Sequence, residues 1–165
     1  MVNHLVIIGF MGVGKSVVGA YVSKELGMPF IDLDLKIAAS FGDISSLFKQ
    51  HGETYFRERE YQLLRDTVHH SDPYILSTGG GILTHEPSYD VLKKCPHLIW
   101  LKASYETVLN RIRDDIGNVR PLADDGMETR FIQRQPLYAS IATETIDVDD
   151  LMIEEVAQKI INRYR

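Results

Sequence analysis

The feature that most constrains this chain is the stretch Gly9-Phe-Met-Gly-Val-Gly14-Lys15-Ser16, which fits the pattern G-x-x-x-x-G-K-[ST]. It follows the apolar run at residues 5–8 and precedes a helical segment. Glycines let the backbone wrap so tightly that successive N–H groups point at phosphates, and the next helix adds its positive end. Lys15 can then reach the β- and γ-phosphates, and the Ser16 hydroxyl can coordinate Mg²⁺. We predict a nucleoside triphosphate site here, although the motif alone does not name the reaction.

Short β-branched runs alternate with helical segments along the 165 residues, which predicts an α/β domain with a mostly parallel sheet. We expect one domain over residues 1–165. The predicted strands are 4–9, 29–32, 74–77, 97–101 and 143–148, and the predicted helices lie near 15–26, 52–70, 87–94, 104–114, 126–138 and 150–163. The polar segment 114–126, with two glycines and a proline, is predicted to form a lid. A passive connection is the alternative.

Composition narrows the functional classes. The net charge of −5 argues against general affinity for nucleic acid, which usually needs a basic face. Cys95 is the only cysteine, so neither an internal disulfide nor a cysteine-based zinc site is expected. No run resembles a membrane span or a signal peptide. We expect a cytoplasmic protein without a membrane partner, monomeric because no coiled coil or obvious sticky patch is found.

Two carboxylates, Asp32 and Asp34, follow the second predicted strand. Ligands of parallel α/β sheets gather at the carboxyl ends of the strands. Asp32, nearest the strand end, is the candidate for holding magnesium, directly or through water. Asp34 is the candidate for contacting or deprotonating an acceptor alcohol. Alternatively, Asp34 simply caps the next helix.

Arginines and a second glycine stretch complete the candidate site. Arg57 lies among glutamates, which is typical of a solvated helix network, but it could also bind an anion together with Arg134. Gly79, Gly80 and Gly81 follow the third predicted strand; they indicate either close approach of backbone to a ligand or a flexible turn. Arg120, in the predicted lid, could neutralise charge on a transferring phosphoryl group.

Together these pieces resemble the shikimate kinase family along nearly the whole chain. The matching stretches are GFMGVGKS (9–16), FIDLD (30–34), FKQHGETYFREREYQLL (48–64), STGGG (77–81), VRPLAD (119–124) and RQPLY (134–138). The resemblance implies a three-layer αβα P-loop kinase fold with a five-stranded parallel sheet and a lid. It also implies phosphorylation of shikimate by ATP with Mg²⁺, giving shikimate 3-phosphate in aromatic amino-acid biosynthesis.

The resemblance also assigns roles residue by residue. Lys15, Asp34 and Arg120 are expected to be catalytic, and Ser16 and Asp32 to serve magnesium. ATP is expected at Gly12, Val13, Gly14, Lys15, Ser16, Val17, Arg113 and Arg120, with Arg111 as the alternative to Arg113 at the adenine. Shikimate is expected at Asp34, Arg57, Gly79, Gly80, Gly81 and Arg134.

The sequence departs from the family pattern in two places. Val17 replaces the family's common threonine, and the stretch between Arg120 and Arg134 is shorter than the family's.

Two other functions fit the same residues. One is a P-loop kinase for another small anionic metabolite, such as a sugar acid or a nucleoside monophosphate, because Arg57 and Arg134 suit any carboxylate or phosphate. The other is a nucleotide-binding regulator that has lost catalysis. Intact Lys15, Ser16, Asp32 and Asp34 argue against that loss.

Overall fold

A five-stranded parallel sheet organises the molecule. The computed structural model describes residues 4–115 and 126–165. Within these residues the sheet has the order β2-β3-β1-β4-β5, and every neighbouring pair is parallel. The strands are β1 His4–Ile8, β2 Phe30–Asp32, β3 Tyr74–Ser77, β4 Leu98–Lys102 and β5 Glu144–Asp147. The predicted α/β fold with a five-stranded parallel sheet is confirmed.

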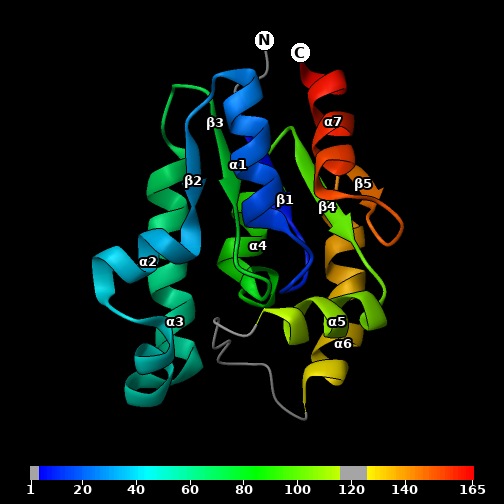
Figure 1. Cartoon of the computed structure of the whole chain (residues 1–165). Coiled ribbons are helices and arrows are strands. Elements are labelled where there is room, and N and C mark those ends of the chain that lie inside the picture. Colours follow the sequence, from blue (N-terminus) through cyan, green and yellow to red (C-terminus); the bar gives the residue numbers. More distant parts are fainter. Residues whose placement is uncertain (1–3, 116–125) are drawn as a thin grey trace.

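Helices cover both faces of this sheet. Figure 1 shows α1 and α7 in front of the sheet and α4 behind it. The helices are α1 Lys15–Leu26, α2 Leu33–Phe41, α3 Ile44–Val68, α4 Glu86–Leu92, α5 Tyr105–Asp114, α6 Met127–Ile141 and α7 Ile153–Tyr164, with a short 3₁₀ helix, η1, at Ile82–Thr84. No described helix combines the length and apolar character needed to cross a bilayer.

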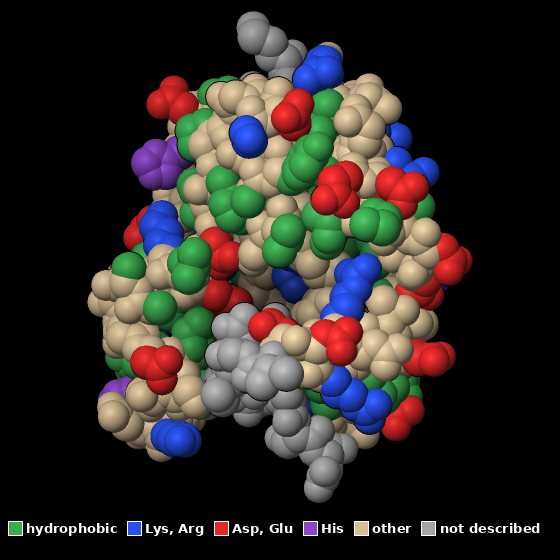
Figure 2. Space-filling view, in the orientation of Figure 1, with side chains coloured by type: hydrophobic (Ala, Val, Ile, Leu, Met, Phe, Trp, Pro, Cys, Tyr) green, Lys and Arg blue, Asp and Glu red, His purple; other side chains and the backbone are tan. Residues whose placement is uncertain are grey.

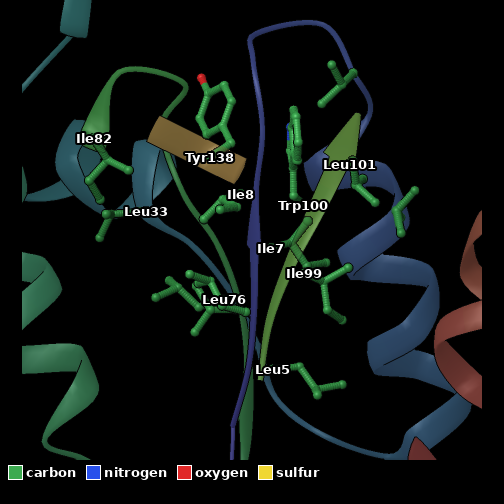
Figure 3. Close-up of a cluster of buried hydrophobic side chains, with 14 of the residues drawn as sticks. Leu5, Ile7, Ile8, Leu33, Leu76, Ile82, Ile99, Trp100, Leu101 and Tyr138 are labelled. Atoms are coloured by element: carbon green, nitrogen blue, oxygen red, sulfur yellow. The ribbon is translucent and has the colours of Figure 1, made fainter. Parts of the chain in front are cut away.

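The core lies along the central strands, which explains their unbroken apolar sequences. Residues 5–8 of β1 are fully buried, because α1 covers one face of the strand and the opposite helical layer covers the other. Figure 3 shows Leu5, Ile7 and Ile8 beside Leu76 of β3 and Ile99 of β4. Packing therefore fixes β1, and with it the loop that follows.

The register of the strands sets the loops at one level. Ile7 of β1 is paired with Ser77 of β3, and Ser77 is paired in turn with Asp32 of β2. The three strands therefore end side by side at the carboxyl edge of the sheet. Strand β1 has β3 on one side and β4 on the other, so the first crossovers add strands on one side of β1 and the later ones add strands on its other side. Such a switch point is where open α/β sheets bind their ligands.

The structure differs from the sequence predictions mainly between β2 and β3. Helix α2, which was not predicted, begins directly after Asp32, whose carboxylate accepts a hydrogen bond from the Leu35 backbone N–H at 3.2 Å. Helix α3 spans Ile44–Val68, but Gly52, with φ 82° and ψ 175°, is non-helical and divides it into two helical parts. The second part begins where the sequence predicted a helix, near residue 52, whereas the first part was not predicted.

Burial of the central strands makes a direct stability prediction. Leu76 is fully buried in β3, whereas Leu35 on α2 is 70% exposed. Leu76→Ala should lower the free energy of unfolding by about 2–5 kcal/mol because it removes packed atoms and leaves a cavity. The matched control Leu35→Ala should cost less than about 0.5 kcal/mol. Urea denaturation followed by circular dichroism measures both, and equal losses would contradict the described core.

Candidate active site

The first wall of the site is the phosphate loop, residues 9–16, between β1 and α1. Gly12 and Gly14 have φ values of 79° and 99°, which L side chains rarely adopt, so glycine is required at these turns. Lys15 is 8% exposed, and its Nζ donates to the carbonyl oxygens of Gly9 and Phe10 at 2.8 and 2.9 Å. The ammonium therefore lies over the loop, at the positive end of α1.

Ser16 and Asp32, the two residues predicted to serve magnesium, lie within hydrogen-bond distance of each other. The Ser16 hydroxyl donates to Asp32 Oδ2 at 2.5 Å, while Asp32 Oδ1 caps α2. The capping role that the sequence offered to Asp34 thus belongs to Asp32. Asp34 lies in the first turn of α2 and is not its capping residue.

The second wall is the triple-glycine loop, residues 79–81, which follows β3. Thr78 ties its start to β1, because both its N–H and its hydroxyl donate to the Ile7 carbonyl, at 3.2 and 3.1 Å. A Cβ added at Gly80 would lie 2.9 Å from the backbone nitrogen of Met11. The triple-glycine loop therefore packs directly against the phosphate loop, and this contact requires the absence of a side chain.

The other two glycines face charged side chains instead. A Cβ at Gly79 would lie 2.5 Å from Glu60 Oε1 and 3.2 Å from Asp34 Oδ1. One at Gly81 would collide with the Arg57 guanidinium and lie 2.9 Å from Arg134 Nη2. The triple-glycine loop thus brings Asp34, Glu60, Arg57 and Arg134 together around its backbone.

Arg57 and Glu60 form a buried ion pair on α3. Arg57 Nη1 donates to Glu60 Oε2 at 2.7 Å, and Nη2 lies 3.3 Å from Glu53 Oε1. Burial raises the pKa of Glu60, and the Arg57 guanidinium counteracts part of that shift. Burial acts to lower the pKa of Arg57, but the contacts with Glu60 and Glu53 outweigh it, so that pKa is raised.

Arg134 is the second buried cation, contributed by α6. It is 4% exposed and its guanidinium lies over the Phe10 ring, 5.6 Å from the ring centre. Its Nη1 atom is buried and has no hydrogen-bond partner among the described residues. Burial lowers the pKa of Arg134, and the neighbouring Arg57 cation lowers it further. Arg134 therefore places a buried guanidinium, with one donor atom that has no hydrogen-bond partner among the described residues, at the triple-glycine loop beside Arg57.

A hollow beside the phosphate loop joins the two walls. Figure 2 shows it in the front face of the molecule, bordered by acidic and basic side chains. Its lining residues are Gly12, Gly14, Lys15, Ser16, Val17, Asp34, Thr78, Arg111, Asp115, Leu151, Met152 and Ile153. Asp34 therefore lines the same hollow as Lys15 and Ser16. An acceptor held by Asp34 could reach a phosphate at Lys15 only if the two residues share one space.

Of the two arginines considered for the adenine side, the structure brings Arg111 to this hollow. Its Nη1 donates to the Val13 carbonyl at 2.7 Å. Arg113, two residues along α5, is exposed and does not line the hollow. The opposite wall consists of Leu151, Met152 and Ile153, which the sequence analysis did not single out as site residues.

The structure does not describe every site residue predicted from the sequence. Arg120 and nearly all of the predicted lid lie outside the described residues. Glu60 was not singled out from the sequence. Its three-residue spacing from Arg57 places both side chains on one helix face, but Glu53, four residues away, shares that face and is exposed, so spacing alone does not identify the buried glutamate.

Comparison with known proteins agrees with this geometry. The family model described as shikimate kinase matches residues 11–165. A shikimate kinase of Enterococcus faecalis is 36% identical over 168 residues, covering 99% of each chain, and one of Staphylococcus aureus is 34% identical over 169 residues, covering 97% of this chain and 95% of the relative. The solved structure of shikimate kinase from Acinetobacter baumannii in complex with shikimate has a TM-score of 0.87 at 30% identity, covering 99% of this chain and 93% of that one.

The chain belongs to the shikimate kinase family.

Membership confirms the family and the kinase class that the sequence motifs predicted. A second solved shikimate kinase, from Aquifex aeolicus, has a TM-score of 0.80 at 30% identity and covers 97% of this chain. The match extends over both walls of the site, so the shikimate kinase fold is shared along the chain rather than at the phosphate loop alone.

The two arginines of α5 give a test of the nucleotide side. Arg111→Ala removes a side chain that lines the hollow and contacts the phosphate loop, so nucleotide affinity should fall about tenfold, or ~1.4 kcal/mol. Arg113→Ala, the matched control on the same helix, should change affinity less than about twofold, which is below ~0.5 kcal/mol. Displacement of a fluorescent ADP analogue measures both. The opposite order would restore Arg113 as the adenine-side residue.

Proposed function

We propose that this chain transfers the γ-phosphoryl group of ATP to a hydroxyl of shikimate, with Asp34, Arg57 and Arg134 holding the acceptor. The single observation that supports this most strongly is the meeting of two buried guanidinium groups at Gly81, where Glu60 is the one buried carboxylate among the described residues. Buried charge is costly unless it is paired. An anionic ligand at this point would satisfy the second arginine.

The acceptor that fits is a carboxylate carrying neighbouring hydroxyls. Planar guanidinium groups bind a carboxylate through paired hydrogen bonds, and Arg134 Nη1 is a buried donor that such a ligand would use. Glu60 Oε1 is likewise buried, without a hydrogen-bond partner among the described residues, and could accept from a hydroxyl. The A. baumannii relative was solved with shikimate, an acid of this kind.

The donor side uses the phosphate loop. Backbone N–H groups at the start of α1 and the Lys15 ammonium would hold the β- and γ-phosphates of ATP. Lys15 now lies on the carbonyls of Gly9 and Phe10, and its flexible side chain can turn from them to a phosphate. We place the nucleotide base between Arg111 and the segment Leu151 to Ile153, the outer walls of the hollow.

The residues present fit a magnesium ion. Ser16 Oγ and Asp32 Oδ2 are 2.5 Å apart, so both oxygens can address a single cation, Asp32 directly or through water. Mg²⁺ is usually held by one or two protein oxygens together with water and substrate phosphates. Bound there, it would neutralise charge on the phosphates during transfer. Among the described residues there is no cluster of three or more acidic, histidine or cysteine ligands that would build a cage without substrate.

Asp34 is the residue that can act on the acceptor hydroxyl. Its carboxylate lies beside the triple-glycine loop and opens into the hollow that contains Lys15. A hydroxyl held there would donate its proton to Asp34 while its oxygen faces the γ-phosphate. Close packing of Gly80 on the phosphate loop keeps the acceptor and donor sites adjacent, which lowers the entropic cost of bringing the reactants together. Arg120 is proposed to meet the transferring group.

Arg57 gives the first test of the acceptor site. Arg57→Lys keeps the charge near Glu60 but loses the planar fork, so the KM for shikimate should rise about tenfold to hundredfold. Arg65→Lys is the matched control, since Arg65 lies on the same helix with a half-exposed side chain and should leave the KM unchanged. Coupled-enzyme detection of ADP release measures both. Equal behaviour of the two variants would remove Arg57 from the acceptor site.

Asp34 gives the second test. Asp34→Asn keeps the side-chain shape but removes the base, so kcat should fall by about 10²–10⁴. Asp66→Asn on α3, a surface position, should retain full activity. Shikimate-dependent ADP release at saturating substrates is the measurement. If the wild-type enzyme instead turns over a different acid in a substrate panel and ignores shikimate, the acceptor is another small anionic metabolite.

A further inference from the structure

Tyr138 is a buried polar residue to which the proposed reaction gives no task. It lies on α6, one helical turn after Arg134, and its side chain is fully buried. Its ring packs against Trp100 with the centroids 5.7 Å apart. Figure 3 shows the ring near the upper ends of the strands, with the hydroxyl pointing toward the loop after β3.

The Tyr138 hydroxyl donates a hydrogen bond to the carbonyl oxygen of Gly80. Gly80 is the middle member of the triple-glycine loop and packs on Met11 of the phosphate loop. Burial raises the pKa of Tyr138, which keeps the hydroxyl protonated, and therefore a donor, at neutral pH. When a buried carbonyl loses its hydrogen-bond donor, no water replaces that donor. The free-energy cost is therefore larger than for the loss of an average hydrogen bond. The contact is therefore suited to holding the triple-glycine loop in place.

The same face of α6 also contacts the phosphate loop. Phe131 meets the Phe10 ring edge-on at 5.2 Å, and the Arg134 guanidinium lies over that ring at 5.6 Å. Residues 131, 134 and 138 are spaced by three and four positions, so they share one side of the helix. Helix α6 thus contacts both loops, and Tyr138 is its connection to Gly80.

We propose that Tyr138 is a positioning residue of the acceptor site, which holds the Gly80 carbonyl so that the triple-glycine loop and Arg134 keep their places around shikimate. This inference rests on the proposed function. Tyr138 acts through Gly80 and does not itself contact a substrate. Its loss should affect the acceptor more than the nucleotide, because the phosphate loop is also held by β1 and α1.

The test compares Tyr138→Phe with Tyr89→Phe. Tyr138→Phe keeps the ring and its contact with Trp100 but removes the donor, so the KM for shikimate should rise about fivefold to tenfold, the range of one lost hydrogen bond. The KM for ATP should change less than about twofold. Tyr89 also reaches α6, through Ser140, but lies outside the site. Tyr89→Phe should leave both KM values unchanged.

A purely structural role would give a different pattern. It would lower thermal stability and change both KM values together, and that result overturns the proposal, as does an unchanged KM for shikimate. Placing 4-aminophenylalanine at position 138 restores a donor and should recover part of the shikimate affinity lost in Tyr138→Phe. Absence of shikimate-dependent turnover in the wild type would instead contradict the proposed function.

Discussion

The close approach of two backbone loops is the constraint on which this site depends. Gly80 can rest against Met11 only because it has no side chain, and the strands β1 and β3 end level only because Ile7 is paired with Ser77. The phosphate loop and the triple-glycine loop are therefore held together by the sheet itself. Side chains then need only to line a space whose size is already set. This arrangement gives the preorganisation that phosphoryl transfer requires, since positioning and charge provide most of its catalysis.

The second feature is an imbalance of buried charge. Arg57 and Arg134 are 6% and 4% exposed, and Glu60 is fully buried between them and Asp34. Such a cluster contributes little to folding, because removing charges from water costs about as much as their attraction returns. The cluster is therefore best understood as a site prepared for an anion, with the sheet and its apolar core supplying the stability that it lacks.

Much of this could be predicted from the sequence, for identifiable reasons. The apolar strands and the glycine pattern of residues 9–16 specify backbone geometry directly, so the parallel sheet and the phosphate loop followed from local rules. Helix α2 was missed because its start depends on one cap, Asp32, which had been interpreted only as a metal residue. The same carboxylate does both, with one oxygen on Leu35 N–H and the other on Ser16.

The sequence could not predict which polar side chains are buried, or which residues far apart in the chain come into contact. Glu58 and Glu60 are alike in the sequence, yet only Glu60 turns inward, because three residues separate it from Arg57 on the helix face that meets the triple-glycine loop. Arg111 and Arg113 are also equivalent by composition, and the direction of α5 decides between them. The bond from Tyr138 to Gly80 could not be foreseen from the sequence, because it spans 58 positions along the chain.

The central claim is that the two buried arginines grip the acid while Asp34 faces the hydroxyl to be phosphorylated. A crystal structure of the protein with shikimate, ADP and magnesium tests this most directly. The account predicts that the shikimate carboxylate receives hydrogen bonds from both Arg57 and Arg134, with a ring hydroxyl between Asp34 and the nucleotide. Shikimate bound elsewhere, or with its carboxylate turned away from both guanidinium groups, would contradict it.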